Sequence, residues 1–325
     1  MPQLLTASRI HFVIAFSLVV LNTHAQVVLL DGAPTAEPGI RVGLVAGDGF
    51  IADHFKVGSA GETWVIDSVE IWAVPDTAPL RAKLGDLYEG VSLFGGIESP
   101  APVPGEPVCD CHNLITVKTG IWHAGSDTPD TNDIEVSKMT SKLWQLTFRN
   151  LSWSVPGGVD IQFGVMGRGR PAPGGQRDRW YSRAAYGAGS HQLRVFDGKG
   201  KFEEAYSDKN GTPLNPDIGI NVQVWGHKPA SISIHKTGSF IEVVLKSDAT
   251  LDSSKTDSAT LRFGPRGAAP VSTQPRTING RTEMILQFQP AETGISPATV
   301  SACLQGAQVD GTPFVGCDLV NSTDK

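Results

Sequence analysis

The stretch Val159-Asp160-Ile161-Gln162-Phe163-Gly164-Val165 places an apolar side chain at every second position. Successive side chains of a β-strand point to opposite faces of the sheet, so this alternation predicts a strand with one face on a hydrophobic core. Similar patterns recur along the chain. They predict further strands over residues 144–148, 218–224, 259–263 and 284–288. We expect other strands over residues 63–74, 115–121, 192–196 and 240–245.

The composition favours an all-β fold made of many short strands. The chain holds 36 glycines and 22 prolines, and only 18% of its residues are charged. Turn signals such as Asn210-Gly211 and Pro156-Gly157-Gly158 separate the alternating stretches. Residues 98–107 and 167–175, rich in proline or glycine, are expected to be long surface loops. Together these features are typical of β-sandwiches or barrels.

The length predicts two domains rather than one. The roughly 300 residues that follow Ala25 reach the size at which single hydrophobic cores stop growing. The best boundary is Gly226-His227-Lys228-Pro229, where a proline follows an alternating stretch. We therefore expect a first domain over 26–228 and a smaller second domain over 229–325.

The first 25 residues are typical of a cleavable secretory signal peptide. An uncharged apolar run over 12–21 follows Arg9, and small residues, Thr23 and Ala25, occupy the positions that a signal peptidase inspects. We expect a secreted or periplasmic protein without membrane insertion. The net charge of −6 gives no reason to expect a nucleic acid as partner.

Four cysteines in an exported chain indicate an oxidising compartment. Cys303 and Cys317 flank the turn sequence Asp310-Gly311-Thr312-Pro313, which predicts a disulfide across a hairpin. Cys109 and Cys111 are separated by one residue. They could form a small ring, stay reduced, or bind copper or zinc with His112 and His123.

Parts of the chain resemble bacterial secreted two-domain β-sandwich proteins. Ala52-Asp53-His54-Phe55, the tryptophan-rich stretch 63–72, the turn before 159–165 and Val224-Trp225-Gly226 resemble their N-terminal module. Residues 259–264 and 311–318 resemble a small C-terminal β-module. The resemblance implies a jelly-roll-like first domain and secretion, and implies little about activity. Residues 277–282 lack the aspartates that suggest calcium in relatives, so that property is not carried over.

The familiar motifs of exported hydrolases are missing from the sequence. There is no Gly-x-Ser-x-Gly elbow and no His-Glu-x-x-His pair. A glycosidase needs two carboxylates across a cleft, and the sequence alone cannot pair any. We therefore expect no catalytic residues, while a secreted hydrolase that cleaves polysaccharide through loop carboxylates remains the alternative.

One arginine-rich stretch is the best candidate for ligand contact. Arg168, Arg170, Arg177 and Arg179 lie close to the aromatic residues Trp180 and Tyr181. Guanidinium groups bind carboxylates or sulfates, and aromatic faces stack on sugar rings or cations. The stretch predicts binding of a polysaccharide or another cell-surface ligand.

An acidic loop leaves calcium open as a cofactor. Asp127, Asp130 and Asp133 place three carboxylates at the short spacing that calcium ligands show. A solvated turn explains the same residues, because the glycine and terminal glutamate of a helix-loop-helix calcium site are missing. No other cofactor is expected.

Overall fold

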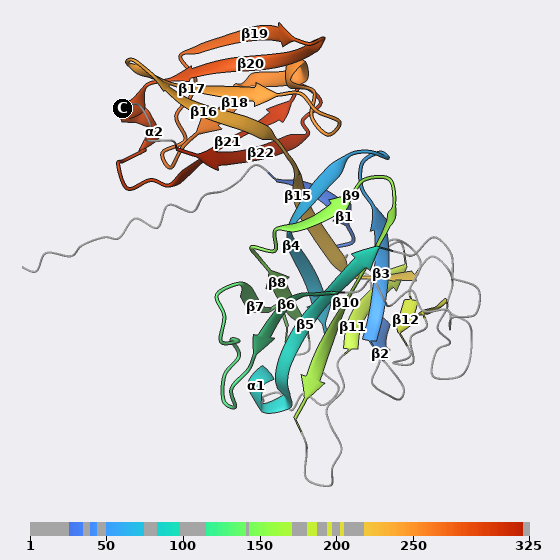
Figure 1. The fold of residues 1–325 in the computed structure, drawn as a ribbon. Coiled ribbons are helices and arrows are strands. Elements are labelled where there is room, and N and C mark those ends of the chain that lie inside the picture. The colour runs from blue at the N-terminus through green and yellow to red at the C-terminus, as the bar shows by residue number, and fades with distance from the viewer. Residues whose placement is uncertain are drawn as a thin grey trace, which may run out of the picture.

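A computed structural model describes residues 26–34, 40–43, 50–74, 83–97, 115–140, 143–170, 181–186, 194–196, 202–204 and 218–320. The described chain is nearly all β, as the composition predicts (Figure 1). Its strands up to β15 build what we call the first sandwich, and the later ones build the second sandwich. The helices α1 and α2 have four residues each, and no described helix is long and apolar enough to cross a membrane.

The first sandwich consists of two facing sheets. In one sheet the order is β14-β11-β4-β15, with β1 on β15, β8 and β9 on β4, and β7 on β8; the other has the order β13-β12-β3-β10-β5-β6. The elements are β1 (Val27–Asp31), β2 (Ile40–Gly43), β3 (Phe50–Lys56), β4 (Thr63–Ala73), α1 (Leu84–Leu87), β5 (Tyr88–Ile97), β6 (Ile115–Ile121), β7 (Ile134–Lys138), β8 (Trp144–Phe148), β9 (Trp153–Pro156), β10 (Asp160–Gly169), β11 (Tyr181–Tyr186), β12 (Arg194–Phe196), β13 (Phe202–Glu204), β14 (Ile218–Ile220) and β15 (Val222–Pro229).

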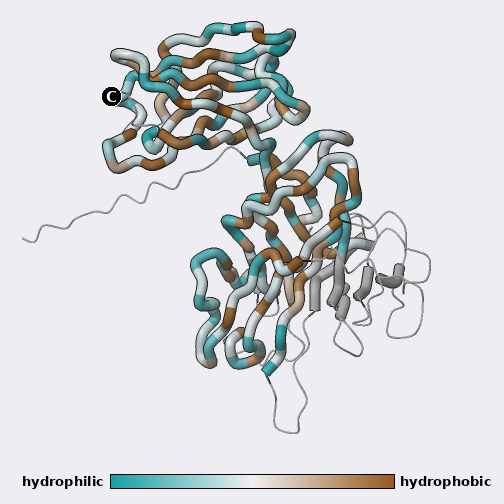
Figure 2. The backbone as a smooth tube through the Cα atoms, in the orientation of Figure 1, coloured by the Kyte–Doolittle hydropathy of each residue, from teal (hydrophilic) through white to brown (hydrophobic). Residues whose placement is uncertain are grey.

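The core of the first sandwich lies between these two sheets. Ile161, Phe163 and Val165 of β10 pack into it, as their alternation predicts. From the opposite sheet come Ile71 of β4 and Leu146 of β8. Figure 2 shows the same alternation as short brown segments separated by white and teal along the strands.

A buried carboxylate also links the two sheets. Asp53 of β3 is fully buried, and its side chain accepts hydrogen bonds from its neighbour His54 N at 2.7 Å and from Ile220 N of β14 at 3.0 Å. Because the second of these donors belongs to the other sheet, Asp53 fixes how the sheets face each other.

The second sandwich has its own hydrophobic cluster. The sheet β16-β17-β20-β19 faces the strands β22, β21 and β18, and the side chains between them include Phe263, Phe288 and Phe314. The β19–β20 hairpin turns at Asn279-Gly280, both with positive φ, which is the preferred chemistry of a two-residue hairpin. The elements are β16 (Ser231–Thr237), β17 (Phe240–Lys246), the 3₁₀ helix η2 (Ser253–Lys255), β18 (Thr256–Phe263), β19 (Ser272–Ile278), β20 (Arg281–Phe288), α2 (Pro290–Thr293), β21 (Ser301–Gln308) and β22 (Pro313–Leu319).

The predicted disulfide is present. Cys303 of β21 and Cys317 of β22 lie directly opposite each other, with an S–S distance of 2.02 Å. The hairpin turns through Gly311, whose φ of 85° suits a glycine.

Two stretches differ from the sequence expectation. The alternating stretch 218–224 is not one strand: it breaks at Asn221, whose buried side chain donates to Gly32 O at 2.8 Å, so β14 pairs with β11 and β15 with β4. Residues 167–169 are not loop but the end of β10, because they still pair with β5.

Candidate functional site

The arginine-rich stretch begins where β10 ends, beside α1. Arg170 donates from Nε to Gly85 O at 2.5 Å and from Nη2 to Trp122 O at 2.6 Å. Its own backbone N–H donates to Leu87 O at 2.7 Å. Two nitrogens of the guanidinium therefore bind backbone carbonyls of the first sandwich, and Arg170 acts as a clamp that holds the end of β10 against α1 and Trp122.

The clamp depends on close packing of α1 against the turn over residues 123–126, which follows β6. The backbone N–H of Gly85 donates to Ser126 O at 2.8 Å, and a Cβ at Gly85 would overlap with the carbonyl oxygen of His123. Only glycine fits at that position. We call the region formed by residues 83–87, 122–130 and 168–170 the α1 corner.

Asp127 belongs to the α1 corner. Its carboxylate accepts from Leu84 N at 3.0 Å and from Lys83 Nζ at 2.6 Å, and the side chain of neighbouring Asp86 accepts from Gly125 N at 2.6 Å. The hydrogen bond from Lys83 to Asp127, helped by their opposite charges, raises the pKa of Lys83 above its ordinary value. The structure thus brings two separate sequence predictions to α1: Asp127 contacts Leu84 N, and Arg170 contacts Gly85 O.

The other two aspartates of the acidic loop bind different partners. Asp130 accepts from Ile121 N at 2.9 Å, whereas Asp133 accepts from Asn150 Nδ2 and Lys118 Nζ, each at 2.9 Å. The hydrogen bonds from Asn150 and then Lys118 lower the pKa of Asp133. Within the described ranges, no three His, Cys, Asp or Glu side chains form a group that could hold a metal ion.

Arg168 differs from Arg170 in exposure. Its Nε lies 2.9 Å from Glu89 Oε2, yet 69% of its side chain is exposed. Exposed ion pairs contribute little to stability. Arg168 can therefore leave Glu89 and contact a ligand with little loss of stability, whereas Arg170 cannot leave its carbonyl partners in this way.

The remaining sequence candidates fall outside the described residues. These are Arg177, Arg179 and Trp180 of the arginine-rich stretch, with Cys109, Cys111 and His112. Tyr181 begins β11, but only its backbone is described. The side chain of His123 is exposed at the α1 corner.

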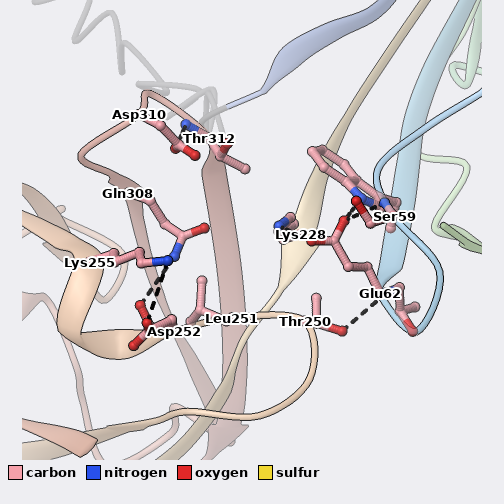
Figure 3. Close-up of polar contacts among 12 residues, drawn as sticks. Ser59, Glu62, Lys228, Thr250, Leu251, Asp252, Lys255, Gln308, Asp310 and Thr312 are labelled. Carbon is pink, nitrogen blue, oxygen red and sulfur yellow. Dashed lines mark hydrogen bonds and ion pairs between the residues drawn. The ribbon is translucent and has the colours of Figure 1, made fainter. Parts of the chain in front are cut away.

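A second polar cluster, missed in the sequence, lies where the two sandwiches meet (Figure 3). Lys228 Nζ is 2.8 Å from Glu62 Oε1 and 5.4 Å from the ring centroid of Trp64. Thr63 N donates to Thr250 Oγ1 of the second sandwich at 3.1 Å. In the same region β15 pairs in parallel with β22 through Lys228 and Phe314. We call this group the junction cluster.

The electrostatics of Glu62 fit a structural role. Burial raises its pKa, but hydrogen bonds from Lys228, Ser59 N and Trp64 Nε1, together with the charge of Lys228, lower the pKa below its ordinary value. One strand position before Lys228, His227 Nδ1 lies 2.7 Å from Asp67 Oδ2. Sequence reasoning missed both pairs because their members are far apart in the chain and share no local motif.

No protein-family model matches this chain, and no curated protein matches it. The site is therefore interpreted from its own chemistry.

Proposed function

We propose that this chain is an exported, non-catalytic β-sandwich protein that binds a glycan or another cell-surface component next to the α1 corner. The contact residues in this proposal are Arg168, Arg177, Arg179, Trp180 and Tyr181. Arg170 has a positioning role in it rather than a contact role.

The observation that carries the proposal is the clamp at Arg170. Its side chain and backbone bind three carbonyls around α1, so the arginine- and aromatic-bearing stretch starts from a fixed point of the sandwich. A contact stretch that starts from a fixed residue loses less conformational entropy on binding than one with both ends free. Exposed guanidinium and aromatic groups are suited to sugar rings and their acidic substituents.

Four carboxylates of the described region are poorly suited to hydrolysis. Polysaccharide hydrolysis by the usual pair of carboxyl groups needs one whose raised pKa keeps it protonated at the working pH. Glu62 and Asp133 instead have lowered pKa values, because hydrogen-bond donors and lysines stabilise their charged forms. Asp127 and Asp130 are engaged with backbone N–H groups.

Export is supported by the Cys303–Cys317 disulfide, since structural disulfides persist mainly in oxidising compartments. We propose a secreted or periplasmic location on this ground and on the signal-peptide pattern of residues 1–25. Protein collected outside the cytoplasm is expected to begin at Gln26. An intact mass that retains residues 1–25 would contradict the export step.

Glycan-array and polysaccharide pull-down binding of the mature chain test the function. The variants Arg179→Ala and Trp180→Ala are expected to bind at least tenfold more weakly, because each removes a proposed ligand contact. Arg149→Ala is the matched control: Arg149 is an exposed arginine of the same sandwich, and its side chain pairs with Glu135 of β7, which is not part of the α1 corner.

Two results would decide against this proposal. If the wild-type chain binds no glycan or surface component, or if both variants bind as well as Arg149→Ala, the proposal is wrong. Release of reducing sugar from a bound polysaccharide, abolished by one acidic substitution that leaves the fold intact, would favour the hydrolase instead.

A further inference from the structure

The two sandwiches have separate hydrophobic cores. Among the described residues, the buried cluster of the first sandwich contains none beyond Val224, and that of the second contains none before Ala230. Figure 1 shows the two bodies meeting at the end of β15. Domains that do not share a large apolar interface move relative to each other unless other contacts hold them. The contacts at the junction therefore decide how firmly the second sandwich is held.

Two segments of the first sandwich contact the second one. The end of β15 is the first segment: it pairs with β22, and directly after it Ala230 N donates to Val315 O at 2.8 Å. The start of β4 is the other segment, where Thr63 N donates to Thr250 Oγ1 at 3.1 Å. Because a single hydrogen bond contributes little net stability, these contacts persist together only while the two segments keep their spacing.

The Glu62–Lys228 pair fixes that spacing. Glu62 directly precedes Thr63, and Lys228 lies two positions before Ala230. Lys228 Nζ donates to Glu62 Oε1 at 2.8 Å, so the pair ties the two contacting segments to each other (Figure 3).

The second sandwich places a carboxylate near the same ammonium group. Asp310 lies in the turn between β21 and β22, and hydrogen bonds from Thr312 and then the charge of Lys228 lower the pKa of Asp310. Lys228 thus interacts with one acidic residue of each sandwich. A buried ammonium group needs such partners, because removing its charge from water is costly.

From this arrangement we propose that the Glu62–Lys228 pair is a latch: it holds the second sandwich while Glu62 is charged, and loss of that charge lets the second sandwich move about residues 228–230. Without the carboxylate, the ammonium group loses its hydrogen-bonded ion-pair partner and moves toward water on its flexible stem. Each sandwich keeps its fold in this state, since the two cores are separate. The inference goes beyond the proposed function and does not depend on it.

Acid is the condition that opens the latch in the unmodified protein. Glu62 and Asp310 both have lowered pKa values, so both are charged at neutral pH. A contribution of this kind is present at neutral pH and disappears as the pH falls through the folded pKa.

Other charged residues surround the junction, so acid alone does not isolate Glu62. Asp248 accepts from Thr250 N at 2.7 Å and thereby supports the residue that binds Thr63. The remaining charged neighbours form pairs of their own: His227 with Asp67, and Lys255 with Asp252. A variant at neutral pH is therefore the sharper test.

Glu62→Gln removes the charge at pH 7 and keeps the shape of the side chain. Amide hydrogen exchange of the full mature chain reports the latch at Thr63 and Ala230, whose N–H groups make the junction hydrogen bonds. We expect Glu62→Gln to accelerate exchange at these two amides at least tenfold more than at the amides of β10 and β20, which lie inside the sandwiches. Glu135→Gln, at an exposed ion pair of the first sandwich, is the control and should leave the ratio unchanged.

Small-angle X-ray scattering measures the movement itself. We expect a larger maximum dimension for Glu62→Gln at pH 7, and for the wild-type chain at pH 3, with far-ultraviolet circular dichroism unchanged. If Glu62→Gln accelerates all amides by the same factor, the pair serves only global stability and the inference is wrong. It is equally wrong if the variant at pH 7 matches the wild type in junction exchange and in maximum dimension. A wild-type chain that stays folded and keeps its maximum dimension at pH 3 would also overturn it; if that chain unfolds there, the comparison at pH 7 decides.

Discussion

At the scale of single residues, the two arginines of β10's end show how similar sequence positions acquire different roles. Arg168 is exposed and paired with one carboxylate, whereas Arg170 holds two carbonyls of neighbouring segments. Both belong to the same arginine-rich stretch, and residue type alone does not separate them. The difference depends on what each guanidinium contacts: Glu89 of the neighbouring strand β5 for Arg168, and the backbone carbonyls of Gly85 and Trp122 for Arg170.

Arg170→Lys should destabilise the first sandwich. A lysine has no planar fork with which to reach Gly85 O and Trp122 O together, so at least one charge-assisted hydrogen bond is lost. We expect the free energy of unfolding to fall by about 2 kcal/mol in urea denaturation. Arg149→Lys, at an exposed ion pair, should change it by less than about 0.5 kcal/mol. Equal effects of the two substitutions would show that Arg170 is not a clamp.

At the scale of elements, period-two alternation located strands with good accuracy. Residues 144–148 form β8 with the same ends, and the alternating stretches 259–263 and 284–288 lie within β18 and β20. The pattern needs only local information, since neighbouring side chains take opposite faces whatever the partner strand is.

Features that depend on distant partners were not predictable in this way. The break at Asn221 follows from a hydrogen bond to Gly32, and the strand over 167–169 follows from pairing with β5. The alternation over 159–165 assigns Gln162 to the wetter face of the sheet, so it does not predict that this side chain is buried. The residue types of the candidate site could be predicted from the sequence. The contacts of Arg170 with Gly85 and Trp122 could not, because these partners are far away in the chain.

The β21–β22 hairpin supports a prediction about the disulfide. Cys303 and Cys317 are 14 positions apart and face each other across strands that are already hydrogen-bonded. Removing the bond therefore acts mainly by freeing the unfolded chain, and closing a loop of this size contributes about 3 kcal/mol in the chain-entropy model.

The double variant Cys303→Ser with Cys317→Ser should keep its far-ultraviolet circular dichroism and lose about 2–3 kcal/mol of unfolding free energy. A reductant added to the wild-type chain should reproduce that loss and leave the double variant unaffected. An unfolded double variant would mean that the disulfide determines the hairpin rather than stabilising it.

At the scale of the whole molecule, the junction cluster is what links the two sandwiches. Lys228 stands on β15, which pairs with β4 of the first sandwich and with β22 of the second. The side chain of Lys228 is 11% exposed and that of its partner Glu62 is 21% exposed, so solvent screens this pair less than a surface pair. The pair therefore makes the link between the sandwiches sensitive to pH.

The direction of this pH dependence follows from the lowered pKa of Glu62. A carboxyl whose pKa is lower in the folded than in the unfolded protein stabilises the fold above its unfolded pKa, and that contribution disappears as the pH falls through the folded value. Glu62 should thus stabilise the protein at neutral pH, begin to lose this contribution as the pH falls below its ordinary pKa of 4.5, and lose it fully below the lower pKa of the folded protein.

Glu62→Gln isolates this contribution. At pH 7 we expect it to lower the free energy of unfolding by about 2 kcal/mol, because Lys228 keeps its charge and loses a charged hydrogen-bond partner. The difference between wild type and variant should shrink steadily from pH 5 to pH 2.5, as protonation removes the same charge from Glu62. Glu135→Gln, at the exposed pair with Arg149, provides the control and should differ from wild type by less than about 0.5 kcal/mol at pH 7. Urea denaturation of the three proteins across this range measures the effect, and a Glu62→Gln difference that stays constant with pH would contradict the assigned role of the pair.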